Sequence, residues 1–334
     1  MYNERLSNYQ LLEQSRGSKL LVYITGDRPG WESQIHSEVV DYFINHLDLF
    51  NMPNKISLLL YTRGGSTLAA WSIVNLIRSF CNEFEVIIPS KAHSAGTLIA
   101  LGSDSILMTK QATMGPIDPS INTPLNPMIP GAPPDAKVPV SVEAIRGFLE
   151  LAKDELKISS DESLKDILIK LADMVHPLVL GEVYRARTQI QMLARKLIVN
   201  QVTEEDKIKD IISFLCSESG SHDYTINRRE ARESLGLCID KPNDELYNLI
   251  KTVYNDISEE LKLKVAWDPN QLIGTGISAP YDVRRVLIES IEGGTDVFVS
   301  QGVLTRQQIQ LQPNLPPQTA INDNRLFEGW KHEN

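Results

Sequence analysis

A serine lies between a histidine and an Ala-Gly pair in the segment KAHSAGTLIAL, residues 91–101, where an apolar strand passes into an apolar helix. Ser94 would occupy the first turn of that helix, beside backbone N–H groups that have no partner within the helix and at the positive end of the helix dipole. Negative charge that develops on an oxygen is stabilised in such a place. The pattern therefore favours Ser94 as a nucleophile; the alternative is an ordinary N-cap serine.

A Gly-Gly pair takes the equivalent position one unit earlier, in LLLYTRGGSTLAAW. Gly64 and Gly65 follow an apolar strand and precede a helix, so backbone N–H groups there can approach a substrate closely; alone, the pair would indicate only a tight turn. If the two strands are neighbours, both corners face the same end of the sheet, and a nucleophile meets hydrogen-bond donors. His93 should point away from the Ser94 hydroxyl, because adjacent residues of an extended segment point to opposite sides.

Short apolar runs alternate with helical patterns over the first 120 residues, which predicts an α/β fold with a largely parallel sheet. The predicted strands are 19–25, 55–62, 84–90 and 105–109. The predicted helices are 33–50, 66–80 and the segment that begins at Ser94.

Seven prolines between residues 118 and 139 predict a long irregular loop. Helical patterns follow at 141–156, 162–175, 177–199, 204–216 and 229–237. Beyond residue 240 we expect helices at 244–267 and 281–294, a small strand pair within 295–313, and a poorly ordered polar tail after Pro313.

Composition and charge exclude several classes of protein. The formal charge of -10 and the absence of a basic cluster argue against a nucleic-acid surface. Cys81, Cys216 and Cys238 are widely spaced without a CxxC pattern, so neither a disulfide framework nor a metal site is expected, and a reducing cytoplasm fits best. No apolar run approaches the length of a membrane span.

Three motifs together, YTRGGSTLAAW, KAHSAGTLIALGSD and ATMGPIDPS, resemble the Clp-peptidase and crotonase superfamily. Within it the chain is most similar to the serine dehydrogenase proteinase family, with signal peptide peptidase A and the stomatin-operon serine peptidases as related groups. The resemblance covers roughly residues 18–240. It implies a Clp/crotonase-like spiral of ββα units with an added helical region, in a peptidase domain over 1–240. The resemblance does not cover residues 241–334, which we expect to form a small C-terminal extension of helices and short strands with a polar tail.

The resemblance also implies roles for residues at the two corners. Ser94 would be the nucleophile, and the backbone N–H groups of Gly65 and Ala95 would form the oxyanion hole. Gly64 and Ser66 would hold an extended substrate peptide by β-augmentation. No cofactor and no metal are implied.

The base that activates Ser94 departs from the Clp pattern. The position of the Clp histidine falls on Asp118, whose ordinary pKa makes it a poor base, so a Ser-His-Asp triad is not supported and a structural role in an Asx-type turn is expected. Asp223 matches the later Clp aspartate, and His222 beside it is an alternative auxiliary residue.

Relatives that use a lysine base carry it in a loop downstream of the serine helix, where this chain has Lys137. Its proline-rich, apolar surroundings are compatible with a lysine that loses its proton by desolvation. We therefore favour a Ser94–Lys137 dyad, with a solvated loop lysine as the alternative. Lys91 and Lys110 are weaker candidates, because each lies at a strand end where its ammonium group can reach water.

The function expected from these features is an ATP-independent serine endopeptidase that cleaves extended peptide segments through an acyl-enzyme. A catalytically inactive peptide-binding scaffold and a crotonase-type acyl-thioester enzyme are the alternatives. The expected partners are a peptide or protein substrate, which could be membrane-associated, and further copies of the chain. Residues 162–217 could supply the oligomer interface, through Leu168, Leu171, Val175, Leu178 and Leu193.

Overall fold

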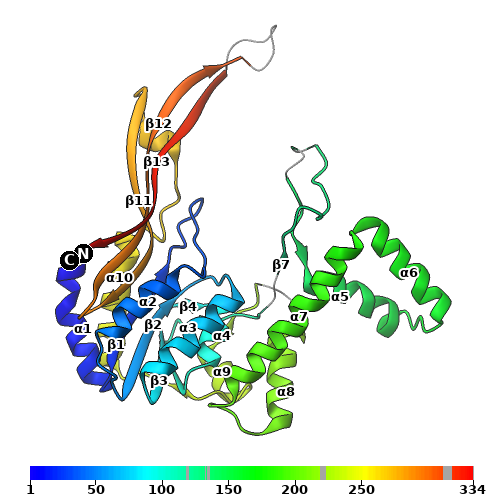
Figure 1. The fold of residues 1–334 in the computed structure, drawn as a ribbon, viewed down its shortest axis with the longest axis horizontal. Helices are drawn as coiled ribbons and strands as arrows, with labels where there is room; N and C mark the ends of the chain where they lie inside the picture. The colour runs from blue at the N-terminus through cyan, green and yellow to red at the C-terminus, as the bar shows by residue number, and fades with distance from the viewer. Residues whose placement is uncertain (118–119, 132, 134–135, 219–222, 311–317, 334) are drawn as a thin grey trace.

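The computed structural model describes residues 1–117, 120–131, 133, 136–218, 223–310 and 318–333. An eight-stranded sheet in the order β10-β5-β3-β2-β1-β11-β12-β13 forms the centre, and helices pack on both of its faces (Figure 1). The strands from β10 to β1 are parallel, whereas those from β1 to β13 are antiparallel. The predicted α/β fold class is confirmed.

The strands of the sheet are β1 Lys19–Thr25, β2 Lys55–Tyr61, β3 Glu83–Ile88, β5 Ser105–Met108, β10 Ile239–Asp240, β11 Ser278–Ser290, β12 Gly294–Ile309 and β13 Gln318–Glu333. The shorter strands are β4 Lys91–Ala92, β6 Thr113–Met114, β7 Ser120–Ile121, β8 Val140–Ser141 and β9 Ile226–Asn227. The α-helices are α1 Tyr2–Arg16, α2 Val39–Asp48, α3 Thr67–Phe80, α4 Ala95–Leu101, α5 Val142–Glu150, α6 Asp161–Met174, α7 Pro177–Ile198, α8 Glu205–Ser213, α9 Arg228–Glu233, α10 Asp244–Glu260 and α11 Pro269–Ile273. Two π-helical turns, Leu151–Glu155 and Phe214–Glu218, continue α5 and α8.

Both faces of the parallel strands are buried, which explains why their sequences are continuous apolar runs. Leu21 and Tyr23 of β1 join the core formed with α2, α3, α4 and α7, whereas Leu20 and Val22 join a second core formed with α1 and α10. Strands β2 and β3 are parallel neighbours, with Leu59 paired to Ile87. The corners that follow these two strands therefore reach the same end of the sheet.

Three predictions for the C-terminal region were wrong. Residues 281–294, predicted as a helix, lie mostly in β11. Residues 295–309 of the predicted strand pair form part of the single strand β12, and residues 318–333 of the tail predicted to be poorly ordered form β13. Ala279, Tyr281 and Val283 alternate with exposed residues, but a bulge after Arg284 breaks the alternation and made the run ambiguous. The proposed boundary at residue 240 stays a prediction; beyond it the chain extends the same sheet.

The helix predicted over residues 33–50 begins only at Val39. Residues 26–38 form a loop without a helix or named strand of its own, which we call the wall loop. Within it, Ile35 is extended because its backbone pairs with the Gly65 corner. A tertiary contact therefore overrides the local helical pattern there.

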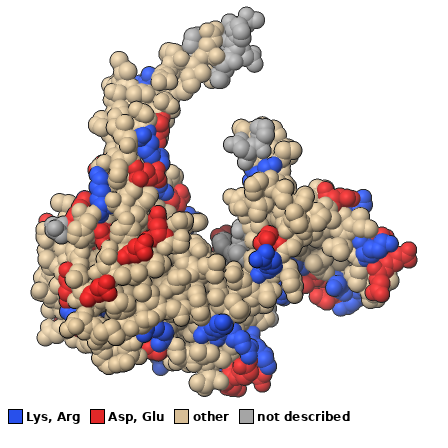
Figure 2. Space-filling model, viewed as in Figure 1, with Lys and Arg blue, Asp and Glu red and all other residues tan. Residues whose placement is uncertain are grey.

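Two parts of the molecule project from the body (Figure 1). Strands β11–β13 rise as a long curved ribbon, and α5, α6 and part of α7 form a helical lobe beside the hairpin that contains β7 and β8. Figure 2 shows an open notch between these projections and a surface on which acidic and basic side chains are interspersed.

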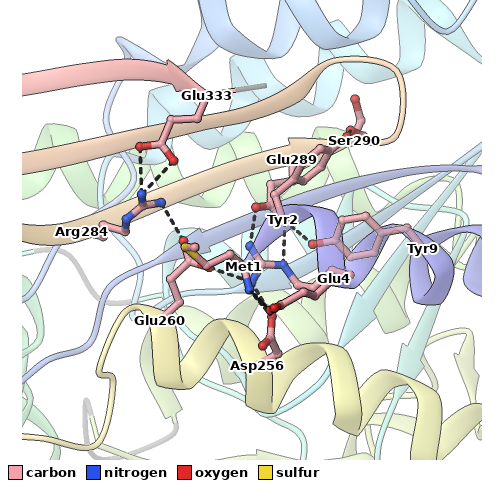
Figure 3. A network of polar contacts seen from close by, with 11 residues as sticks. Met1, Tyr2, Glu4, Tyr9, Asp256, Glu260, Arg284, Glu289, Ser290 and Glu333 are labelled. Carbon is pink, nitrogen blue, oxygen red and sulfur yellow. Dashed lines mark hydrogen bonds and ion pairs between the residues drawn. The ribbon is translucent and has the colours of Figure 1, made fainter.

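A buried arginine, Arg5, joins the N-terminal helix to the C-terminal strands. Figure 3 labels its partners Asp256, Glu260 and Glu289. The guanidinium of Arg5, 1% exposed, donates to both carboxylate oxygens of the fully buried Glu289 on β11, at 3.1 and 2.5 Å. It also donates to Asp256 at 2.5 Å and Glu260 at 2.7 Å, both on α10. Burial alone would lower the pKa of Arg5, but the bonds and charge of Glu289 outweigh it and raise this pKa. The charge of Glu289 is thus compensated inside the protein.

Replacing Arg5 should destabilise the fold strongly. Arg5→Met leaves the Glu289 carboxylate buried without its counter-ion, so we expect the free energy of unfolding to fall by about 3–5 kcal/mol. The control is Arg185→Met, which removes an exposed arginine paired with Glu182 on α7 and should change stability by less than about 0.5 kcal/mol. Urea unfolding of both variants is the measurement; equal, small effects would contradict the buried pair.

Candidate active site

The first corner of the site lies between β2 and α3. Gly64 and Gly65 have φ angles of 117° and 144°, which side chains of L-residues rarely adopt. Ser66 caps α3, since its Oγ accepts a hydrogen bond from the Ala69 N–H at 3.2 Å. The glycines therefore allow the chain to leave the strand sharply before the cap starts the helix.

Ile35 of the wall loop holds this corner in place. Its N–H donates to the Gly64 carbonyl at 2.8 Å, and its carbonyl accepts from the Ser66 N–H at 2.9 Å. In a parallel bridge of this kind, Ile35 bonds to the Gly64 carbonyl and the Ser66 N–H, which are the backbone groups on either side of Gly65. The N–H of Gly65 itself therefore points away from Ile35, to the opposite edge of the segment. A Cβ on Gly65 would lie 2.4 Å from the Ile35 backbone N and O, so the pairing requires glycine.

The second corner carries Ser94, between β4 and α4. Ser94 has φ 51° and ψ -113°, an uncommon conformation for a residue with a side chain. It occupies the N-cap position of α4, yet its hydroxyl makes no capping hydrogen bond. The ordinary N-cap alternative therefore does not describe this serine, and its half-buried hydroxyl is available for other chemistry.

The two corners are in contact. A Cβ on Gly64 would lie 2.8 Å from the Ser94 Cβ and 3.3 Å from the Ala95 backbone N. Below the corners, Thr62 and Ala92 form a parallel bridge, in which the Thr62 N–H donates to the Lys91 carbonyl at 3.1 Å. The Ser94 side chain and the first amide of α4 are thus held against the Gly-Gly backbone.

A cleft of about 420 Å³ opens at Ser94. It is lined by Asp27, Pro29, Glu32, Arg63, Lys91, His93, Ser94, Pro116, Asp223 and Leu263. The lining is rich in charged groups and comes from the wall loop, both corners, the segment after β6, the turn before β9 and the residues that follow α10. Such a cleft suits a polar, extended ligand better than an apolar small molecule.

Charged side chains on one wall of the cleft are already paired. Lys91 Nζ lies 2.6 Å from Asp27 Oδ2, and Arg63 lies 3.4 Å from Asp27 Oδ1. The Tyr61 hydroxyl donates to Asp27 at 2.9 Å. Burial, followed by the neighbouring Tyr254 and Asp27, raises the pKa of Tyr61 well above its usual value, so this hydroxyl keeps its proton and remains a donor. Asp27 is therefore the centre of a fixed charge cluster.

The predicted auxiliary residues have different positions. Asp223 lines the cleft with Ser94, whereas Asp118 and His222 lie outside the described residues. His93 lines the cleft too; its Nε2 is 2.9 Å from the Thr113 hydroxyl, and its ring lies against Gly115. The ring is thus held by the segment around β6.

The predicted lysines are also separated. Lys137 pairs with Met128 in an antiparallel bridge on the hairpin between β7 and β8, and it is not among the residues that line the cleft. Lys110 lies over the Tyr247 ring, with its Nζ 4.3 Å from the ring centroid. Lys91 is the lysine that the described structure brings to the Ser94 cleft.

Sequence reasoning missed Asp27, Arg63 and the wall loop. Asp27 follows the end of a parallel strand, and Arg63 precedes Gly64, so both lie where ligand sites form in α/β proteins. That position was a usable signal. No local signal marks Ile35, because its role depends on a partner 30 residues away.

Comparison with known proteins confirms the resemblance. The family of ClpP-like SDH-type serine proteinases matches residues 47–132, which include both corners. Two uncharacterized proteins of Methanocaldococcus jannaschii are similar. One is 32% identical over 197 residues (59% of this chain, 57% of the relative), the other 31% over 178 residues (53% and 50%). The chain thus spans about half the length of the curated relatives it matches.

Solved structures similar to this chain include two mutants of the membrane-bound stomatin-specific protease 1510-N, one in complex with a substrate peptide. Each is 18% identical and covers 70% of this chain; the shares of their own chains are 85% and 80%, and the TM-scores 0.38 and 0.37. ClpP1 from Listeria monocytogenes is 15% identical with a TM-score of 0.37, over 71% of this chain and 98% of that one. The family match supports a serine peptidase as the general class of activity.

The described residues contain neither a candidate membrane-spanning helix nor a candidate metal site. No helix there is both long and apolar enough to cross a membrane. No group of three or more His, Cys, Asp or Glu side chains in that part of the chain is arranged to hold a metal ion.

Gly65→Ala should damage the corner, because the new Cβ would collide with the Ile35 backbone. We expect a loss of roughly 2 kcal/mol or more in the free energy of unfolding, since the positive φ alone costs about 1–2 kcal/mol. Gly181→Ala in α7 is the control: a Cβ there meets nothing within 4 Å, and the helix should gain up to about 1 kcal/mol. Denaturant midpoints of both variants test this; an unaffected Gly65→Ala protein would refute the pairing.

Proposed function

We propose that this chain is an ATP-independent serine peptidase that cleaves extended peptide segments through an acyl-enzyme on Ser94. The observation that carries the proposal is the contact between the two corners, which brings the Ser94 side chain and the Ala95 amide against the Gly64–Gly65 backbone. Ser94 lies within the residues that the family matches, and its hydroxyl does not cap its helix.

The chemistry would proceed in two steps. Ser94 Oγ attacks the scissile carbonyl carbon while a base takes its proton, and the carbonyl oxygen becomes an oxyanion. The N–H groups of Gly65 and Ala95 stabilise that oxyanion; one such donor contributes about 10²–10³-fold to the rate. The intermediate then collapses to an ester and expels the amine with a proton from the base. Water hydrolyses the ester by the reverse transfers.

The substrate would lie against the first corner. Ile35 occupies one edge of the segment Gly64–Ser66, so the other edge, where the Gly65 N–H points, is the one that a peptide strand can use. The polar cleft gives such a peptide room beside Ser94.

Lys137 remains our proposal for the general base. Lys91 lines the cleft, but its ammonium nitrogen is engaged by the Asp27 carboxylate at 2.6 Å, so we assign it to the charge cluster around Asp27 and not to the role of base. No ion pair involves Lys137 in the described part of the chain, and its hairpin starts just after Pro116, which lines the cleft. For Lys137 to act, this hairpin must fold down over the cleft when a peptide binds.

We also propose that the chain forms a homo-oligomer through α6 and α7. Leu168 and Leu178 are 55% and 65% exposed, and an apolar cavity of about 220 Å³ lies between these helices and α5. Val175 and Leu193 are buried in the monomer, so they belong to the core and not to this surface. A second copy of the lobe is the proposed occupant. Location in the cytoplasm stays a prediction.

Replacing Ser94 should abolish reaction with a fluorophosphonate probe. Ser94→Ala removes the only atom that the proposed mechanism uses as nucleophile, so labelling and peptide hydrolysis should disappear while the circular dichroism spectrum is kept. Ser79→Ala, on the exposed face of α3, is the matched control and should label as the wild type does. Undiminished labelling of the Ser94→Ala protein would reject the proposal.

Lysine variants identify the base. We expect Lys137→Met to slow labelling by about 10²-fold or more, the usual contribution of a general base. Lys110→Met is the control and should leave the rate unchanged. A large loss in Lys91→Met together with a normal rate in Lys137→Met would transfer the role to Lys91.

A further inference from the structure

The geometry points to a role for the C-terminal arm, which comprises residues 263–277 and strands β11–β13, in the catalytic site itself. The arm fixes the wall loop, and the wall loop fixes the Gly65 amide, with Trp31 as the positioning residue between them. The consequence for catalysis rests on the proposed function; the structural coupling does not.

The inner side of the wall loop forms part of the site. Asp27, Pro29 and Glu32 line the Ser94 cleft. Ile35, 1% exposed, makes the two backbone hydrogen bonds that hold Gly64 and Ser66. Movement of the loop would therefore change both the shape of the cleft and the direction of the Gly65 N–H.

The outer side of the wall loop is bonded to the arm through backbone groups. The Gly26 N–H donates to the Arg285 carbonyl at 2.6 Å, and the Trp267 N–H donates to the Pro29 carbonyl at 2.8 Å. Arg285 returns a bond from its guanidinium to the Glu32 carbonyl at 3.0 Å. The arm therefore bonds to the wall loop at its first residue, Gly26, and at Pro29 and Glu32, which line the cleft.

Trp31 is the side chain that locks the two parts together. Its ring centroid lies 5.0 Å from that of Trp267 and 5.5 Å from that of Tyr281. The guanidinium groups of Arg285 and Arg325 lie over the same ring, at 5.3 and 4.9 Å. Trp31 therefore has partners on the segment before β11, on β11 and on β13.

The wall loop contains no helix or named strand, so its position depends on contacts with other parts of the chain. On the outer side these contacts come from the arm; on the inner side they are the Gly64–Ser66 pairing and the bonds of Asp27 to the body. An oxyanion hole works only if its donors are fixed before the reaction, and a displacement of about 1 Å can reduce the rate by 10²-fold. Loosening Trp31 should thus weaken catalysis without touching any group in the cleft.

A matched control exists on the same arm. Trp330 of β13 also joins the arm to the body, by stacking on Tyr42 of α2 at 4.4 Å; within the arm it makes an edge contact with Phe298 of β12 at 5.7 Å. Neither of these ring contacts involves the wall loop. Trp31→Ala and Trp330→Ala therefore remove the same side chain from two attachments of one arm.

Two measurements on the full chain test the inference. Hydrogen exchange followed by mass spectrometry should show faster exchange in peptides covering 26–38 and 62–68 for Trp31→Ala, and unchanged exchange there for Trp330→Ala. Fluorophosphonate labelling of Ser94 should slow by about 10- to 100-fold in Trp31→Ala and by less than about 2-fold in Trp330→Ala. Trp31→Phe, which keeps an aromatic ring, should recover most of the rate.

Contrary results are distinguishable. Unchanged exchange at 62–68 in Trp31→Ala, or equal slowing of labelling in both tryptophan variants, would overturn the inference. If the wild type does not label at Ser94, the proposed function fails, while the exchange comparison still decides the coupling. If Trp31→Ala does not fold, Arg325→Gln replaces it, since it removes the cation that lies over the same ring, and unchanged exchange at 26–38 and 62–68 in that variant would overturn the inference.

Discussion

The close approach of the Gly64 backbone to Ser94 is the contact on which the rest of the site depends. It is possible only because residue 64 has no side chain, and because parallel pairing of β2 with β3 brings both corners to one end of the sheet. The bridge between Thr62 and Ala92 then fixes the spacing of the corners. The positive φ of Ser94 is a local strain that these surroundings maintain, as is common at sites of chemistry.

The core of the site could be predicted from sequence because its signals are local. A glycine pair after a strand and a serine before a helix both follow from short-range rules of turn and helix geometry, and they agreed with the motifs of the family that matches residues 47–132. The strands from 19 to 109 were predicted because burial on both faces leaves continuous apolar runs. Where the local sequence pattern and the tertiary contacts favour the same conformation, that conformation can be predicted from a single sequence.

The remainder could not be predicted, because it depends on partners far away in the chain. Residues 33–38 have a helical pattern, but the backbone of Ile35 is taken by the glycine corner. Strands β11 and β13 contain mixed charged and apolar residues whose alternation is broken by bulges, so pairing with β12 decides their conformation. The position of Lys137 depends on the conformation of a hairpin, which the spacing of apolar residues in the sequence does not predict.

The ion network of Arg5 affects the order in which the protein can be built. The N-terminal helix leaves the ribosome early, yet Glu289, the carboxylate that compensates its buried guanidinium, lies 284 residues later in the chain. Until β11 has been synthesised, the edge of β1 that pairs with it has unpaired backbone groups. Such an open strand edge is prone to pair with strands of other chains. Closure of the sheet is therefore a late, long-range event in the folding of the chain.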